Sequence, residues 1–235
     1  MAITTVLFDL DGTLLPMDQN LFVKAYFGLL AKKLASHGYD PKALLDAIWK
    51  GTGAMVTNPG EKTNEEVFWD TFSSLMGRDC RTDEPLFREF YENEFGSVQA
   101  SCGFTPKAAE TIALVKRKGL RTALATSPIF PAIATAQRIA WAGLTPGDFE
   151  YVTTYENSRH AKPNPDYYRD VMERLGVRAE ECLMVGNDVT EDIVAQTLGM
   201  KVFLLTDCIV NRKDEDISRY PRGGFDALMS FIESL

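Results

Sequence analysis

Carboxylates follow two apolar segments of this 235-residue sequence at positions suited to phosphoryl-transfer chemistry. Asp9 and Asp11 come directly after the segment 3–8, and Asp188 comes shortly after the segment 182–185. Three carboxylates brought close together would repel one another strongly. A hard divalent cation with a preference for oxygen ligands, Mg²⁺ above all, would remove this repulsion and would attract an anionic substrate. The three aspartates therefore predict a Mg²⁺ site.

The order Asp9-Leu10-Asp11-Gly12-Thr13 predicts a division of labour between the first two aspartates. Asp9, at the end of a strand, is placed to attack phosphorus as a carboxylate nucleophile and to form an aspartyl-phosphate. Asp11 is placed to give a proton to the leaving oxygen and later to take one from water. Gly12 would let the backbone approach the substrate closely.

Further polar residues follow other apolar segments. Thr126 and Ser127 come after the segment 120–125 and could hold phosphate oxygens. Lys162 precedes Pro163 and could neutralise charge on both the phosphate and Asp9. Structural alternatives stay open: Thr126 could cap a helix, Lys162 could be a solvated surface lysine, and Asp192 could serve only to stabilise a helix N-terminus.

The elements that must position these residues alternate along most of the chain. Strands are expected at 3–8, 120–125, 149–153, 182–185 and 202–205, with helices at 106–118, 131–141, 165–175, 190–198 and 225–232. Alternation of this kind predicts an α/β fold with a parallel sheet covered on both faces. The carboxyl ends of parallel strands form one rim, where ligands bind. The polar residues above should therefore converge there.

Residues 20–95 have a different texture, with apolar residues at helical spacing and almost no strand signal. Four helices are expected there, the second beginning at Asp40-Pro41. The stretch 51–60 is expected to be a loop, and Trp49, Met55 and Trp69 are assigned to the core of the insert. We therefore predict a core domain made of residues 1–16 and 100–235 and a helical cap domain of residues 17–99.

At this point the sequence resembles the haloacid dehalogenase (HAD) superfamily, in its phosphatase branch with a helical C1-type cap. Residues 9–13 are similar to the D-x-D-G-T motif, and Thr126-Ser127 and Lys162-Pro163 resemble the second and third motifs. The run 186–192 resembles the acidic fourth motif. The resemblance covers residues 3 to about 206, although the cap matches only in position and helicity.

The resemblance implies a Rossmann-like core and a Mg²⁺ held by Asp9, Asp188 and the backbone carbonyl of Asp11. Asn187 and Asp192 are expected in support. Asn187 stands where family members often carry aspartate, and the spacing of Asp188 to Asp192 favours Asp188 as the ligand. Gly12, Thr13 and Ser127 are expected to contact substrate. Two residues beside the cap loop, Lys50 and Asn58, are candidates for the same role.

The composition of the chain disfavours some classes of binding partner. The net charge of −8 makes nucleic acid and anionic membranes unfavourable partners, and no apolar run approaches the roughly 20 residues that span a bilayer. The N-terminus lacks the pattern of a signal peptide, so a cytoplasmic protein is expected. The four cysteines have no metal-site spacing and are expected to be free thiols. The oligomeric state is left open.

The expected function is Mg²⁺-dependent hydrolysis of a small phosphorylated metabolite. A phosphomutase of the β-phosphoglucomutase type would keep both aspartates and stays an alternative. A haloacid dehalogenase would not need Asp11 as an acid, and a non-catalytic module would be expected to lose at least one of the catalytic positions.

Overall fold

A six-stranded parallel sheet forms the centre of the molecule in a computed structural model that describes residues 2–235. Its order is β3-β2-β1-β4-β5-β6. The strands are β1 Thr5–Phe8, β2 Arg121–Leu124, β3 Tyr151–Val152, β4 Cys182–Gly186, β5 Lys201–Leu205 and β6 Arg222–Gly223. The predicted α/β fold is confirmed. The sequence analysis missed β6, because a two-residue edge strand is too short to show a strand period.

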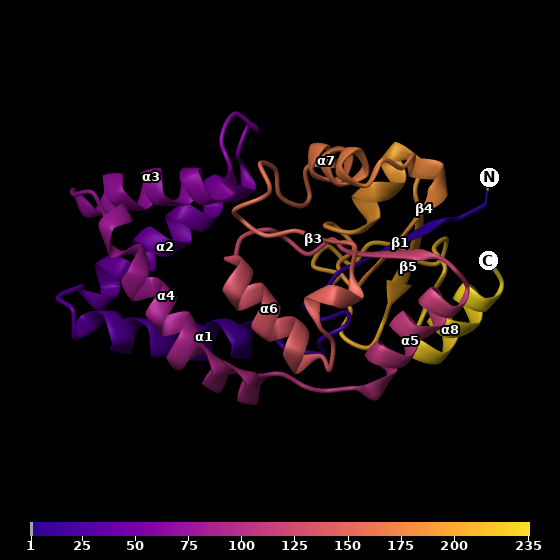
Figure 1. Ribbon diagram of the computed structural model, residues 1–235, viewed down its shortest axis with the longest axis horizontal. Helices are drawn as coiled ribbons and strands as arrows, with labels where there is room; N and C mark the ends of the chain where they lie inside the picture. The colour runs from indigo at the N-terminus through magenta and orange to yellow at the C-terminus, as the bar shows by residue number, and fades with distance from the viewer. Residues whose placement is uncertain (1) are drawn as a thin grey trace.

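Eight α-helices accompany the sheet in the described residues, and the first four gather at one end of the molecule (Figure 1). They are α1 Gln19–Ala35, α2 Pro41–Val56, α3 Asn64–Met76, α4 Glu84–Asn93, α5 Pro106–Arg117, α6 Ala132–Trp141, α7 Pro165–Leu175 and α8 Phe225–Glu233. Short 3-10 segments occur at Arg81–Asp83, Phe95–Ser101, Pro146–Asp148, Ala179–Glu181 and Ile193–Leu198. We call α1–α4, residues 19–93, the helical insert. Both chain termini lie at the end of the molecule opposite this insert (Figure 1).

Strand β1 shows why the sheet is covered on both faces. All four of its side chains are buried. Val6 and Phe8 belong to an apolar cluster that includes residues of α5 and α8, whereas Leu7 belongs to a second cluster with residues of α7. Since successive side chains of a strand point to opposite faces, one continuous apolar strand can bury two layers of helices.

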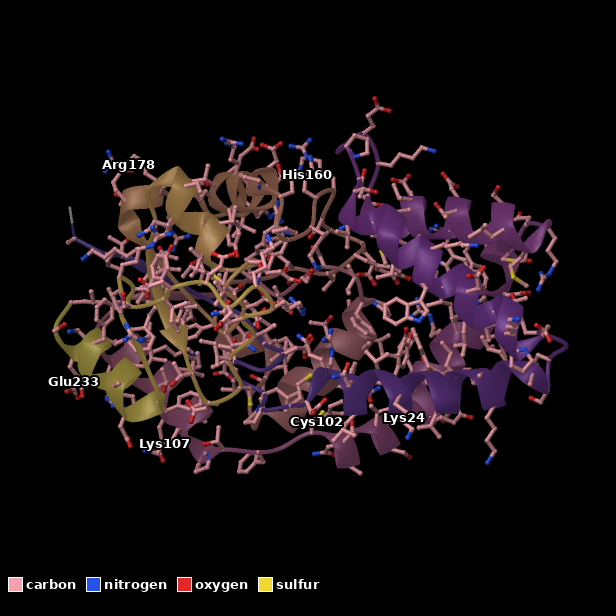
Figure 2. The ribbon with its side chains drawn as sticks, turned by 180° about the vertical axis from the view of Figure 1, so that it is seen from behind. Lys24, Cys102, Lys107, His160, Arg178 and Glu233 are labelled. Carbon is pink, nitrogen blue, oxygen red and sulfur yellow. The ribbon has the colours of Figure 1, made fainter. Side chains whose placement is uncertain are left out.

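The chain passes between the sheet and the helical insert at two points that lie side by side. Met17 and Cys102 form an isolated antiparallel bridge, and the Gly103 amide donates to the Pro16 carbonyl at 2.7 Å. Cys102 marks this crossing in Figure 2, where Lys24 lies on the insert. The division into residues 17–99 and the remainder begins and ends beside this crossing, and it stays a prediction.

The predicted loop at 51–60 is wrong for its first half, because α2 continues to Val56. Gly51 lies inside the helix, where α2 packs on α3. A Cβ atom added to Gly51 would lie 2.9 Å from a ring carbon of Phe68. The glycine therefore permits close packing of two helices and does not break one of them. Its helix cost of about 1 kcal/mol is offset by burial that the local sequence does not show.

The predicted helix at 190–198 is shorter than expected. A 3-10 segment covers Ile193–Leu198 and ends at Gly199, which has a positive φ of 100°. The residues before it form a turn, because the Asp188 carboxylate accepts hydrogen bonds from the amides of Thr190 and Glu191.

Cys182 is buried, and all four cysteines are free, as expected. No helix within residues 2–235 has the length and apolar character needed to cross a bilayer.

Candidate active site

The site begins at the point where the strand order changes direction. The chain runs from β1 outward to β2 and β3 and then returns to β4 on the other side of β1. Phe8 pairs in register with Val185, and the Asp9 amide donates to the Val185 carbonyl at 2.9 Å. The residues after β1 and β4 therefore leave the sheet side by side, as expected at such a switch point.

Both carboxylate oxygens of Asp9 are held by the protein. Oδ1 accepts a hydrogen bond from Lys162 Nζ at 2.9 Å, and Oδ2 accepts one from Thr13 Oγ1 at 3.1 Å. Asp9 is buried, with 7% of its surface exposed. Burial raises the pKa of Asp9, and the ammonium of Lys162 opposes this effect. The carboxylate is thus fixed in orientation and lies beside a positive charge.

Lys162 joins two carboxylates in the interior. Its Nζ also donates to Asp192 Oδ1 at 2.7 Å, and only 1% of the lysine is exposed. Burial by itself would lower the pKa of Lys162, but the charges of Asp192 and Asp9 outweigh it, so the pKa lies well above its usual value. The lysine is therefore a permanent cation, and the surface-lysine alternative does not hold.

Asn187 ties the loop after β1 to the loop after β5. Its Oδ1 accepts from Thr13 Oγ1 at 3.1 Å, and its Nδ2 donates to the Cys208 carbonyl at 2.7 Å. Gly12 has a φ of 85°, and a Cβ atom there would lie 2.3 Å from Asn187 Nδ2. The glycine is thus required both by its backbone conformation and by the amide packed against it.

This packing changes the roles expected for Gly12 and Thr13. Neither residue is among those that line the cavity described below. The Thr13 hydroxyl lies between Asp9 and Asn187, so its hydrogen bonds are made within the protein. The geometry does not support substrate contact by Gly12 and Thr13, and it places them behind Asp9 as supports.

Asp192 braces the loop after β4. Its Oδ2 accepts from the Asp188 amide at 2.9 Å, while its Oδ1 receives Lys162. A Cβ atom on Gly186 would lie 2.1 Å from Asp192 Oδ2, so only glycine leaves room for this carboxylate. Asp192 is thus more than a helix-end charge, since it orients the lysine that contacts Asp9.

Asp11 has a partner that the sequence analysis missed. Its Oδ2 forms an ion pair with the guanidinium of Arg138, a fully buried residue of α6. The guanidinium also lies 4.3 Å from the ring centroid of Phe130. The second oxygen, Asp11 Oδ1, is buried and has no hydrogen-bond partner. The only sequence signal for Arg138 is a lone arginine in the otherwise uncharged helix 132–141.

Asp188 is likewise paired with an arginine. Its Oδ2 lies 2.6 Å from Nη1 of Arg212, which follows β5 and also donates to Gln19 Oε1 of α1 at 3.2 Å. The Arg212 side chain is 55% exposed, whereas that of Asp188 is only 6% exposed. The ion pair is therefore open to solvent on the arginine side, and nothing in the local sequence indicates the role of Arg212.

The oxygen atoms around Asp9 and Asp188 suit a Mg²⁺ ion. Within residues 2–235 no three Asp, Glu, His or Cys side chains converge as a ready set of metal ligands. Mg²⁺, however, is usually held by one or two carboxylates together with water and substrate phosphate. Asp9, Asp11 and Asp188 all line the same cavity, so two carboxylates and the backbone carbonyl of Asp11 are available there. These all-oxygen donors fit a hard divalent cation.

A cavity of about 420 Å³ opens above these residues, between the sheet rim and the helical insert. This volume lies within the roughly 300–1,000 Å³ usual for small-molecule sites. The core side of the cavity is polar and includes Thr126 and Ser127 beside the aspartates and Lys162. Glu191 also lines it, and burial raises the pKa of Glu191 to about 7. The structure thus brings together the rim residues expected from the sequence.

The two substrate contacts expected from the insert do not lie at this cavity. Lys50 is exposed and pairs with Asp46 one helical turn away, at 2.7 Å. Asn58 is buried, and its Nδ2 donates to the Lys62 carbonyl and to Asn64 Oδ1. The geometry does not support substrate contact by either side chain, because the partners of each lie within the protein.

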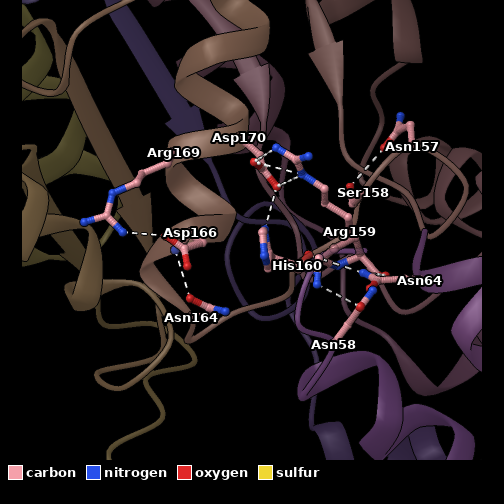
Figure 3. Close-up of polar contacts among 12 residues, drawn as sticks. Asn58, Asn64, Asn157, Ser158, Arg159, His160, Asn164, Asp166, Arg169 and Asp170 are labelled. Carbon is pink, nitrogen blue, oxygen red and sulfur yellow. Dashed lines mark hydrogen bonds and ion pairs between the residues drawn. The ribbon is translucent and has the colours of Figure 1, made fainter. Parts of the chain in front are cut away.

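Asn58 instead belongs to a polar junction between the insert and the core (Figure 3). Asn64 Nδ2 donates to the Pro128 carbonyl at 3.1 Å and to the His160 carbonyl at 3.3 Å. His160 itself bonds to Asp170 through Nδ1 at 2.7 Å. The two asparagines therefore connect the loop after α2 to loops of the core that border the site.

The insert side of the cavity is aromatic, which corrects another expectation. Trp69 is buried in the core of the insert, as expected, and also borders the cavity, whereas Trp49 lines the cavity without being buried. Trp49 is 54% exposed and packs edge-on against Phe27. Met55 is buried, as expected. A helical apolar stripe in the sequence does not distinguish residues that pack together from residues that face a ligand space.

Comparison with known proteins bears on this geometry. A family model described as haloacid dehalogenase-like hydrolase matches residues 3–195. The chain belongs to this hydrolase family. The match spans the loop after β1, the helical insert and the loop after β4, so it includes every element that contributes an aspartate to the site.

Relatives with curated names agree with this family. A pyrophosphatase PpaX of Bacillus velezensis is 22% identical over 206 residues, covering 85% of this chain and 81% of the relative. A phosphoglycolate phosphatase of Escherichia coli (strain K12) is 27% identical over 202 residues, covering 83% and 77%.

Solved structures of this hydrolase family share the fold. A HAD phosphatase from Thermococcus onnurineus has a TM-score of 0.60 at 20% identity, covering 99% of this chain and 98% of its own. A 2-haloacid dehalogenase from Pseudomonas syringae has a TM-score of 0.63 at 21% identity, with coverage of 99% and 98%. At such identities the likeness shows the fold alone.

Proposed function

We propose that this hydrolase is a Mg²⁺-dependent phosphatase that cleaves a small phosphate monoester through an aspartyl-phosphate. One observation carries the proposal: Asp9 lines the cavity with its carboxylate held between Lys162 and Thr13, and Asp11 follows two residues later. The curated relatives named as phosphatases support the same reaction class.

In the first half-reaction an oxygen of Asp9 attacks phosphorus, and the bond from phosphorus to the ester oxygen breaks. Lys162 offsets the negative charge that gathers on the phosphate and on Asp9, since it lies 2.9 Å from that carboxylate. Thr126 and Ser127, which line the cavity, would bind the phosphate oxygens. Positioning and charge stabilisation of this kind account for most of the rate enhancement in enzymatic phosphoryl transfer.

Asp11 supplies the proton that the leaving alcohol needs. Because Oδ2 is bound to Arg138, the proton is carried by Oδ1, the oxygen that has no partner. In the second half-reaction the same oxygen accepts a proton from water as that water attacks the aspartyl-phosphate. Asp9 is then released together with inorganic phosphate, and the residues return to their starting state.

Asp9, Asp188 and the backbone carbonyl of Asp11 would hold the Mg²⁺ ion, which neutralises phosphate charge when bound. Asp188 must exchange its contact with Arg212 for this purpose. Asn187 and Asp192 keep the supporting roles described above. The helical insert would act as a cap that limits access of bulk water to the cavity.

The phosphomutase alternative is less well supported by the cavity. A mutase that works through a bisphosphate must bind one phosphate at Asp9 and a second phosphate at the far side. The cavity-lining residues of the insert include no lysine, arginine or histidine. A dianionic group on that side would therefore lack a counter-charge, which favours simple hydrolysis.

Phosphate release from p-nitrophenyl phosphate, with Mg²⁺ and with excess EDTA, tests the reaction class. We expect release with Mg²⁺, loss of release with EDTA, and a fall of roughly a thousandfold or more for Asp9→Asn. Circular dichroism of the variant checks that it is folded. Full activity of folded Asp9→Asn would refute the proposed mechanism, and isomerisation of a hexose 1-phosphate without phosphate release would favour the mutase.

A further inference from the structure

We infer that the preferred substrate is a phosphate monoester of an uncharged, largely apolar alcohol, with an aromatic or branched aliphatic group bound by the helical insert. This inference rests on the proposed phosphatase function and names its substrate class. It also separates this protein from what the curated relatives are named for, since phosphoglycolate and pyrophosphate both carry a second anionic group.

The first argument is the distribution of charge around the cavity. Among the described residues that line it, the cations are Lys162 and Arg212, and both belong to the core. Lys162 is bound by Asp9 and Asp192, and Arg212 by Asp188. A metal bound at Asp188 would release Arg212, but Arg212 and Lys162 both belong to the core, and the insert side of the cavity has no cation of its own. A leaving group with a carboxylate or second phosphate would be desolvated beside the insert without a cation.

The second argument is the surface that the insert presents instead. Aromatic rings from all four of its helices line the cavity, among them Phe22, Tyr26, Trp49, Phe68, Trp69 and Tyr91. Large flat side chains of this kind offer apolar contact area and favour stacked or edge-on packing against a ring. None of the lining residues between 17 and 91 carries a charged side chain.

The polar tips of the two tyrosines do not change this character. The hydroxyls of Tyr26 and Tyr91 bond to each other at 2.8 Å, so each has a partner within the protein. Burial raises the pKa of Tyr26 to about 12, and it also raises the pKa of Tyr91 well above its usual value. Both phenols are therefore neutral at physiological pH. The wall that they form is suited to a hydrocarbon group and unsuited to a sugar rich in hydroxyls.

Two alkyl esters with leaving groups of similar kind provide the direct test: 2-phenylethyl phosphate and 2-phosphoglycolate, with pyrophosphate as a third substrate. We expect kcat/KM for the phenylethyl ester to exceed that for phosphoglycolate roughly tenfold to a hundredfold, the effect of burying one aromatic side group. An equal or higher value for phosphoglycolate or pyrophosphate would overturn the substrate inference and leave the phosphatase proposal intact.

Variants at the insert side distinguish cavity contact from general effects on the insert. Trp49→Ala should raise KM for the phenylethyl ester about tenfold with little change in kcat, because the ring binds ground state and transition state alike. Leu75→Ala is the matched control, since Leu75 is 45% exposed on α3 and does not line the cavity. Equal effects of the two substitutions would contradict the inference.

A charge introduced into the wall should reverse the preference. Thr52 of α2 lines the cavity, so Thr52→Lys should lower the ratio of kcat/KM for phenylethyl ester over phosphoglycolate at least about tenfold. Ala54→Lys, on the same helix but away from the cavity, should leave the ratio unchanged. An unchanged ratio in Thr52→Lys would argue against substrate binding at this wall.

Failure of the proposed phosphatase function would be visible separately, as no phosphate release from any ester. In that case titration calorimetry with 2-phenylethylphosphonate and phosphonoacetate, both with Mg²⁺, still tests the cavity. Tighter binding of the phenylethyl compound would uphold the apolar preference. Tighter binding of phosphonoacetate would overturn it.

Discussion

The guanidinium of Arg138 forms an ion pair with Oδ2 of Asp11, which joins α6 to the loop after β1 across 127 positions of the sequence. Arg138 is fully buried and lies over the ring of Phe130. The carboxylate proposed as general acid and base is therefore oriented by a helix that also packs against α4 of the helical insert. Arg138 is a positioning residue, since it contacts Asp11 and does not line the cavity.

Replacing Arg138 with methionine should lower kcat about tenfold to a hundredfold with little change in KM, because Asp11 loses its fixed orientation. The substitution also leaves the Asp11 charge without a partner, so the free energy of unfolding should fall by about 3 kcal/mol. Steady-state kinetics and thermal denaturation would measure both effects. The double variant Arg138→Met/Asp11→Asn should regain stability and stay inactive. If it regains no stability, loss of the ion pair is not what destabilises Arg138→Met.

Lys162→Met should abolish activity and destabilise the fold by about 3–5 kcal/mol, because two buried carboxylates lose their shared cation. Lys107→Met is the control, since Lys107 is half-buried at the surface and pairs with exposed Asp226, and it should cost at most about 1 kcal/mol. Denaturant titration measures both. Equal destabilisation of the two variants would contradict the role assigned to Lys162.

The pH dependence of Lys162→Met gives a second check. Burial is the main cause that raises the pKa of Asp9 and of Asp192, and the lysine that opposes it is absent in the variant. Unfolded carboxyls lose their protons near pH 4, whereas the folded ones would hold theirs to higher pH. The stability of the variant should therefore fall as pH rises from about 4 toward neutrality, more steeply than that of the wild type. If the stability of the variant does not change with pH over this range, the pKa values of Asp9 and Asp192 are not raised in the folded variant.

Arg212→Ala should lower the Mg²⁺ concentration needed for half-maximal effect, about threefold to tenfold, because Asp188 no longer exchanges an arginine for the ion. The rise of the melting temperature with added Mg²⁺ measures this without turnover. Lys213→Ala is the control, since Lys213 is an exposed neighbour that does not line the cavity. An unchanged or raised Mg²⁺ requirement in Arg212→Ala would show that Asp188 is not a metal ligand.

Asn58→Ala should destabilise the protein by about 1–3 kcal/mol, because its removal leaves Asn64 Oδ1 and the Gly60 amide without the hydrogen-bond partners that Asn58 supplies. Lys50→Ala should change stability by less than about 0.5 kcal/mol and leave KM unaltered, since its pair with Asp46 is exposed. Denaturant titration and kinetics check both. A clear rise of KM in Lys50→Ala would restore the substrate contact that the geometry does not support.

Much of the fold was determined locally by the sequence. Asp40-Pro41 and Thr105-Pro106 start helices where predicted, because a capping side chain followed by proline meets the needs of a first turn. The short apolar segment before Asp9 predicts a buried strand that ends there. Chain order then places Asp9, Thr126 and Asp188 at one rim, because all parallel strands end at the same edge.

Tertiary structure alone decided which side chains meet at that rim and which face the cavity. Arg138 and Arg212 find Asp11 and Asp188 through packing between distant segments, and no local pattern encodes such pairs. Gly51 stays in a helix because Phe68 packs against it. Trp49 faces the cavity because the packing of α2 against the neighbouring helices of the insert turns that side of α2 toward it. A sequence specifies the apolar period of a helix, whereas the partner of each face is chosen by the free energy of the whole packed core.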